Sequence, residues 1–252
     1  MPEISIIQEI IVLISALFAG FIDAICGGGG LIIIPMLIAF GLGEQLAIST
    51  HKFQAMFAMC CSFSTLFKYI EFKKVFIGMI FSIIGGILGA RVLLIINPEP
   101  LKPIILFTLL LIFIYSIFNS KLGSIKAKQI MSEKLFYPFF GLLIGFYDGF
   151  LGPATGSFWI FASISLIGQD IKQASINAKA LCMASGMISL IIFMIDFKIY
   201  YSLGLKMAVC GIFGAFLGAK FVLKYKSDSI KKIFLVIVFI TLLKLTYEYY
   251  LK

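Results

Sequence analysis

The sequence predicts an all-α polytopic membrane protein made of two homologous repeats, each with a broken or re-entrant segment and three transmembrane helices. Three observations predict this class. The 252 residues are 61% hydrophobic and 13% charged, with a mean hydropathy of +1.09, far more apolar than a soluble domain requires. Most apolar runs approach the roughly 20 residues that cross a bilayer, and strand-like alternation is absent. A glycine-rich break also occurs twice, in matching places.

The first apolar run, 4–26, leads into the first break. Residues 20–30 read GFIDAICGGGG, which places Asp23 and four glycines inside an apolar stretch. Such breakers free backbone polar groups that hydrocarbon cannot satisfy, so this backbone must lie against protein or a water-filled cavity. No Lys or Arg precedes Lys52, so we interpret the run as structure rather than as a signal peptide.

The next run, 30–40, is short and predicts a half-helix, because at 1.5 Å per residue it crosses only about half of the hydrocarbon core. The runs 47–67, 75–96 and 101–118 predict ordinary spans. These elements form the first repeat, residues 1–118.

A basic linker, 119–134, separates this repeat from the second, 135–252. The run 135–151 leads into the second break, where 145–156 reads GFYDGFLGPATG, and the following run 157–167 is again short. Three further runs predict spans: 174–195, 199–223 and 230–250.

Matches between the halves continue beyond the breaks and predict a duplication. At a constant spacing of 127, Gly41, Ala47, Thr50 and Lys52 align with Gly168, Ala174, Asn177 and Lys179. Two broken segments in corresponding positions are the best sequence indication of a transporter's binding site.

The net charge of +9 sits mostly in short connections, which the positive-inside rule explains without a nucleic-acid partner. The rule places 68–74, 119–134 and 224–232 inside and 97–102 and 196–199 outside. Each repeat then crosses an odd number of times, so we expect inverted repeats and an outside N-terminus. A continuous kinked span in place of the re-entrant segment would instead make the repeats parallel.

The breaks are candidate binding sites for a small oxyanion. A helix that begins after a glycine-rich turn points unpaired N–H groups and its positive end at a ligand. The candidates are Gly27, Gly28, Gly29, Gly30, Thr155, Gly156 and Ser157. The alternative is close helix packing through small residues, which better explains a second set of glycines: Gly85, Gly89, Gly214 and Gly218.

Asp23 and Asp148 are intramembrane carboxylates and therefore functional candidates. Three roles are open: orienting the broken backbone, taking up a coupling proton, or pairing with Lys52 or Lys179. Because an acid facing an anion would repel it, the backbone-orienting role is favoured.

Lys52 and Lys179 begin the span after each short run, close to Thr50 and Asn177. A symmetric pair of cations suits an anion pathway. The alternative is that each lysine extends its charge to a membrane face.

Signatures of an enzyme are missing from the sequence. The five Cys have no metal-ligand spacing, His51 is the single His, and no Walker A sequence is present. We expect no catalysis, no cofactor and no metal, and an ion gradient as the energy source. Trp159 is expected at the membrane interface.

The paired motifs at 20–32 and 145–158, each followed by a stretch that ends in Lys52 or Lys179, resemble the TauE/SafE sulfite exporter family, also called the DUF81 group. The resemblance covers nearly the whole chain and implies a permease of the prokaryotic inner membrane for small sulfur-containing anions. Two positions depart from the family pattern: Ala154 replaces a frequent Gly, and His51 stands where Asn is expected.

The leading hypothesis is a secondary transporter for a small anion such as sulfite, an organosulfonate or a related carboxylate, held between the breaks and moved by alternating access. One rival is a non-transporting membrane assembly partner that docks through small-residue faces. Another is a cation-coupled permease in which Asp23 and Asp148 hold the ion. The sequence leaves the direction of transport, the coupling ion and the oligomeric state open.

Overall fold

The computed structural model describes residues 5–95, 129–196 and 199–230 and five positions between 232 and 239. Three predicted features lie largely or wholly outside the described residues: the span 101–118, the linker 119–134 and the span 230–250.

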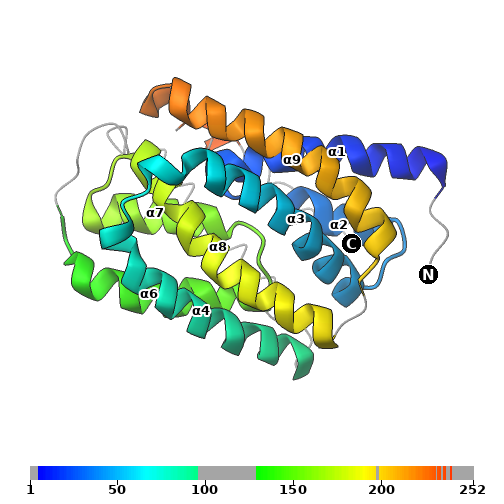
Figure 1. Cartoon of the computed structure of the whole chain (residues 1–252), viewed down its shortest axis with the longest axis horizontal. Helices are drawn as coiled ribbons and strands as arrows, with labels where there is room; N and C mark the ends of the chain where they lie inside the picture. Colours follow the sequence, from blue (N-terminus) through cyan, green and yellow to red (C-terminus); the bar gives the residue numbers. More distant parts are fainter. Residues whose placement is uncertain are drawn as a thin grey trace.

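The described residues form helices joined by short connections, and no strand occurs among them (Figure 1). In chain order these are α1 (Ile6–Cys26), α2 (Gly30–Ala39), α3 (Glu44–Leu66), the 3-10 turn η1 (Phe67–Tyr69), α4 (Phe72–Ile95), α6 (Glu133–Phe150), α7 (Thr155–Ile167), α8 (Ile171–Asp196) and α9 (Tyr201–Lys224). In the described part of the chain, α1, α4, α8 and α9 are long and apolar enough to cross a membrane.

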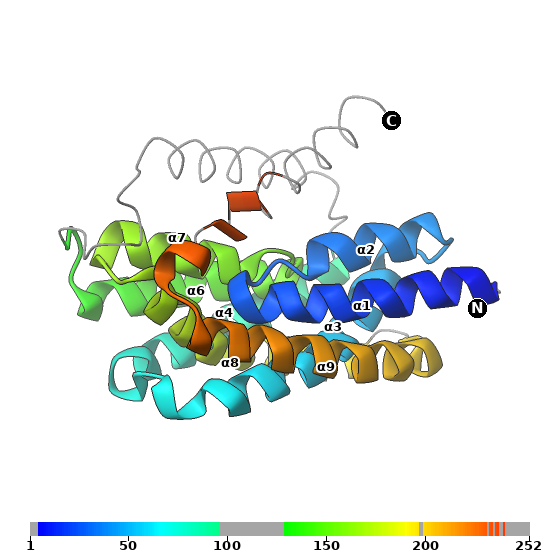
Figure 2. The ribbon, with the colours of Figure 1, turned by 90° about the horizontal axis from the view of Figure 1, so that it is seen from above.

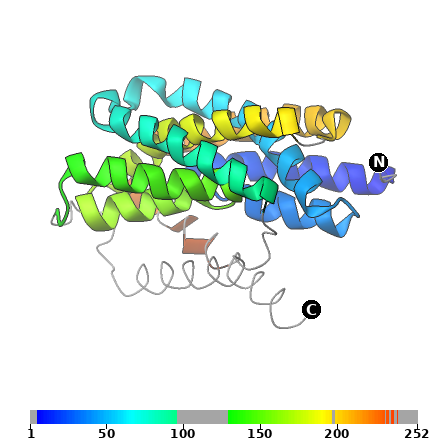
Figure 3. The same ribbon diagram turned by 90° about the horizontal axis from the view of Figure 1, so that it is seen from below.

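The short helices α2 and α7 match the half-helices predicted at 30–40 and 157–167. They lie toward opposite ends of one face of the bundle (Figures 2 and 3). α7 begins two residues before the predicted run, because Ala154 adopts the left-handed backbone conformation, with φ of 64°, that usually requires glycine. α1 ends in the same way at Gly27, with φ of 73°.

Glycines bring two pairs of helices into direct backbone contact. A Cβ at Gly145 of α6 would lie 2.6 Å from the Ser82 carbonyl oxygen of α4, and one at Gly85 of α4 would lie 2.6 Å from the Phe146 nitrogen. α1 and α9 pack in the same manner, since Gly214 lies against Leu17. The packing interpretation of the second set of glycines is therefore the correct one.

The helix directions place the connections at two ends. α1 and α9 run parallel, as do α4 and α6, and the first pair runs opposite to the second (Figure 1). At one end, Gln173 donates to the Tyr69 carbonyl at 3.1 Å, and Lys172 donates to the Leu223 carbonyl at 2.8 Å. At the other end, the Tyr200 N–H donates to Thr50 Oγ1 at 3.1 Å.

Trp159 does not lie at a surface, contrary to the expectation of an interface position. Its side chain is fully buried in α7 and packs edge-on against Phe136, with the ring centroids 6.2 Å apart. The hydrophobic periodicity of a ten- to thirteen-residue apolar helix does not indicate which aromatic ring faces inward, because all its sides are apolar.

Candidate functional site

The two breaks touch one another at the centre of the molecule. A Cβ at Gly156 would lie 2.6 Å from the α-carbon of Gly27. The backbones of the two breaks are therefore in direct contact and leave no room for a side chain at either glycine. The Ser157 hydroxyl donates to the Cys26 carbonyl at 2.8 Å, which ties the start of α7 to the end of α1. Two segments about 130 residues apart in the sequence thus form one site.

A cavity of about 60 Å³ lies beside this contact. At the roughly 10–15 Å³ that a water molecule requires by this measure, it has room for a few waters or one small oxyanion. Its walls come from α1, α2, α3, α6, α7, α8 and both breaks. The lining residues that carry polar or charged side chains or begin the short helices are Asp23, Gly30, His51, Lys52, Asp148, Thr155 and Gly156.

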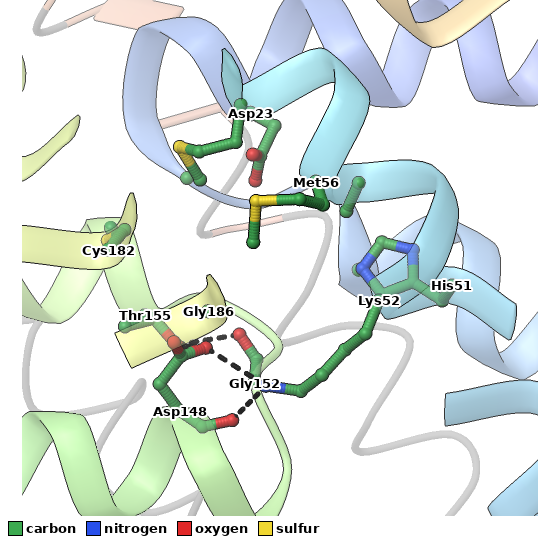
Figure 4. Close-up of a pocket in the computed structure, with 14 residues that line it drawn as sticks. Asp23, His51, Lys52, Met56, Asp148, Gly152, Thr155, Cys182 and Gly186 are labelled. Carbon is green, nitrogen blue, oxygen red and sulfur yellow. Dashed lines mark hydrogen bonds and ion pairs between the residues drawn. The ribbon is translucent and has the colours of Figure 1, made fainter. Parts of the chain in front are cut away.

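Asp148 is the most densely bonded group of the cavity wall. Its carboxylate lies 3.4 Å from Lys52 Nζ and 3.1 Å from the Thr155 hydroxyl (Figure 4). It also lies 2.6 Å from the Ser185 hydroxyl. Buried carboxylates are stable when they are paired and hydrogen-bonded in this way. The arrangement holds α6, α7, α8 and α3 together around one charge.

Asp23 is bound differently. Its Oδ1 accepts the Gly29 N–H at 3.2 Å, the type of contact that a backbone-orienting role requires. No hydroxyl donates to the Asp23 carboxylate within the described residues, in contrast to Asp148.

The two lysines are exchanged between the halves. Lys52, from the first half, donates to the main-chain carbonyl of Asp148, and Lys179, from the second half, donates to the main-chain carbonyl of Asp23. Each lysine therefore lies at the C-terminal turn of the other half's broken helix, where main-chain carbonyls and the negative end of the dipole favour a cation. Lys52 is 7% exposed and Lys179 is fully buried, so neither extends to a membrane face.

The structure separates the predicted site residues into two groups. Asp23, Gly27, Gly30, Lys52, Asp148, Thr155 and Gly156 line the cavity, whereas Gly28, Gly29, Thr50, Ser157, Asn177 and Lys179 are not among its lining residues. Thr50 and Ser157 tie segments together through the contacts described above. Asn177 accepts the Glu71 N–H at 3.1 Å and is a link between α8 and the start of α4.

Several cavity residues were missed by sequence reasoning, and some of them had a usable signal. Ala55, Met56 and Met59 follow Lys52 at helical spacing on α3, so a functional Lys52 predicts that they share its face. No sequence pattern indicates that Cys182 and Gly186 of α8 line the cavity, because their position depends on how α8 packs against the other half.

The family model described as "Sulfite exporter TauE/SafE" matches residues 12–245. A "Probable membrane transporter protein" of Haemophilus influenzae is 34% identical over 91% of this chain and 91% of its own length. The "Probable membrane transporter protein YfcA" of Escherichia coli K12 is 32% identical over 92% of this chain and 87% of its own length. No solved structure matches the chain.

Proposed function

Because the chain belongs to the TauE/SafE family of integral membrane proteins, we propose that it is a secondary transporter for a small anion, with sulfite and organosulfonates as the first substrates to test. The observation that carries the proposal is the central cavity between the two breaks. Its walls combine the Lys52 ammonium group and residues from the first turns of two short helices, Gly30 of α2 and Gly156 of α7.

The donor set suits an oxyanion in size and chemistry. N-terminal N–H groups and an ammonium group are donors that anion sites use. A second observation also supports a guest in this cavity: His51 is 8% exposed, lines the cavity, and its Nδ1 has no hydrogen-bond partner in the described part of the chain. A buried polar atom without a partner is costly unless another state supplies one.

The proposal includes two inverted repeats, residues 1–118 and 135–252, joined by the linker 119–134. The opposite directions of α1 and α6, the pairing of α4 with α6 and of α9 with α1, and the exchanged lysines support this relation. Alternating access then takes the form of one repeat rocking against the other around the cavity.

The inner membrane of a prokaryotic cell is the expected location. The connections that the positive-inside rule assigned inside lie at one end of the bundle wherever they are described, and this grouping supports the orientation.

The test is transport by purified protein in liposomes with radiolabelled sulfite and methanesulfonate. Lys52→Ala should weaken the affinity for the transported anion about thirtyfold or more, because truncating a buried charged partner costs about 2–5 kcal/mol. Lys73→Ala is the matched control, since Lys73 is exposed at the start of α4 and away from the cavity.

A second variant separates binding from folding. Lys52→Ala leaves Asp148 buried without its cation, so the double variant Lys52→Ala with Asp148→Asn removes both charges and should restore folding without restoring anion affinity. Wild-type affinity for the anion in the double variant would show that Lys52 is not part of the anion site. Flux that depends on pH and is lost with Asp23→Asn or Asp148→Asn would favour the cation-coupled rival.

A further inference from the structure

The single histidine occupies an unusual place in the cavity. His51 lies on α3 beside Lys52, and a Cβ at Gly30 would lie 2.8 Å from its Nε2. The imidazole edge therefore rests on the first residue of α2, at the positive end of that helix dipole. Figure 4 shows His51 and Lys52 on the same side of the pocket, with Lys52 extended toward Asp148.

The charges around the cavity leave an anion without a counter-charge. Asp23, Asp148, Lys52 and the adjacent Lys179 sum to zero when all four are ionised. The helix dipoles also offset one another, because the negative ends of α1 and α6 meet here with the positive ends of α2 and α7. A monovalent guest would thus add one uncompensated negative charge to a buried site, which is strongly unfavourable.

We propose that His51 takes up one proton with each anion, so that its imidazolium supplies the missing positive charge and donates Nε2–H to the guest. This inference rests on the proposed function and adds its coupling: the anion and a proton bind together on one side of the membrane and leave together on the other. The proton comes from the aqueous phase on the binding side and returns to water on release.

Other titratable groups at the cavity are less suited to this role. From α1 the facing group is Asp23, from α3 Lys52, from α6 Asp148 and from α8 Cys182, whereas α2 and α7 contribute none. Asp148 is held by an ammonium group and two hydroxyls, and Lys52 is held by Asp148. Protonation of Asp23 would also neutralise one charge, so Asp23 is the competitor that the experiment must separate from His51.

Because the chain contains one His, ¹⁵N-labelled histidine gives a single imidazole to follow by NMR, provided that the purification tag contains no histidine. Methanesulfonate is the probe, because it is a strong acid and keeps its charge between about pH 5 and 8. Saturating methanesulfonate should move the imidazole titration midpoint upward. By reciprocity, the Kd for methanesulfonate should fall as pH falls, by up to about tenfold per pH unit. A midpoint that does not move while methanesulfonate binds overturns the inference.

Liposomes that contain a pH-sensitive dye measure the coupling itself. Wild-type protein should acidify the interior when external methanesulfonate enters. His51→Asn and His51→Gln, which keep one polar atom each but cannot become cationic, should lose both the acidification and the pH dependence of Kd. Acidification retained in both histidine variants, or lost only in Asp23→Asn, overturns the assignment to His51.

The two proposals fail in distinguishable ways. If neither sulfite nor methanesulfonate raises the melting temperature of the wild-type protein or crosses the membrane at any of these pH values, the anion-transport proposal itself is wrong. If the anion moves without a proton, transport stands and the role of His51 does not. Should the histidine variants fail to fold, the NMR titration of the wild-type protein still decides the question.

Discussion

At the residue scale, the two halves differ most in what surrounds their aspartates. Thr155 and Ser185 face Asp148, whereas the corresponding positions of the first half hold Gly30, which also begins a short helix, and Ala58, 127 residues before Ser185. Asp148 therefore has two hydroxyl donors that Asp23 lacks. We infer that the hydrogen bonds of Asp148 hold its carboxylate in one position. The Asp23 side of the cavity has fewer such bonds and is therefore freer to change its contacts.

Ser185→Ala should lower the stability of the protein by about 1.5–3 kcal/mol, the usual value for a hydrogen bond to a charged group. The Ser185 hydroxyl donates to Asp148 Oδ2 at 2.6 Å, and the substitution leaves that oxygen short of a donor in a buried site. Thermal unfolding in detergent measures the change.

Ser82→Ala is the matched control for this prediction. Ser82 is also fully buried in a helix, but its hydroxyl has no partner among the described residues, so its removal should be neutral or stabilising. Equal losses in the two variants would mean that the bond to Asp148 contributes nothing specific.

At the scale of elements, the two breaks act as one unit because their backbones touch. The closest approach joins Gly27 and Gly156, and no side chain fits between them. A movement of the backbone at one break must therefore displace the backbone of the other break.

Gly156→Ala should destabilise the protein by about 1–3 kcal/mol or more and reduce transport, since the added methyl group meets backbone that cannot rotate away. Gly43→Ala is the control: Gly43 has a φ of −59° and open space where a Cβ would lie. Melting temperature and initial uptake rate should both fall in the first variant and stay near wild type in the second. Normal transport in Gly156→Ala would show that the breaks can separate without loss of function.

The elements were largely predictable from the sequence, whereas the site was predictable only in part. Glycine and proline clusters in apolar runs mark where α1 and α6 must end, so the half-helices match to within two residues. The contact of Lys52 with Asp148 joins residues 96 apart, and hydrophobic patterns carry no information about that pairing. His51 was missed because neighbouring helical residues point about 100° apart, so a functional Lys52 does not predict that His51 shares its face.

At the scale of the whole molecule, the positions of the connections at the two ends of the bundle bear on its orientation in the membrane. The segments that precede α6 and follow α9 lie at the end where α4 begins, and the segment that precedes α3 lies at the opposite end (Figure 1). An inverted pair of repeats requires these ends to face opposite sides of the membrane.

Single cysteines at the exposed positions Gln129, Lys226 and Gly43 test this arrangement. In oriented vesicles, a membrane-impermeant maleimide should label the first two from the cytoplasmic side and the third from the other side. The unmodified chain is the control for its five native cysteines, which are buried or half-buried. Labelling of all three positions from one side would contradict the inverted arrangement.

The exchanged lysines also set an order of events during synthesis. The Asp23 carbonyl near the end of α1 accepts the Gly27 N–H and also Lys179, which follows Asp23 by 156 residues. At about 5–20 residues per second, a ribosome needs roughly 8–30 s to deliver that lysine after Asp23 has been made. During this interval the first broken helix has its local cap, the Gly27 N–H, but lacks the cation at its C-terminal end. Water, lipid headgroups or the insertion machinery must therefore stabilise the negative end of α1 and the Asp23 carboxylate until the second half arrives.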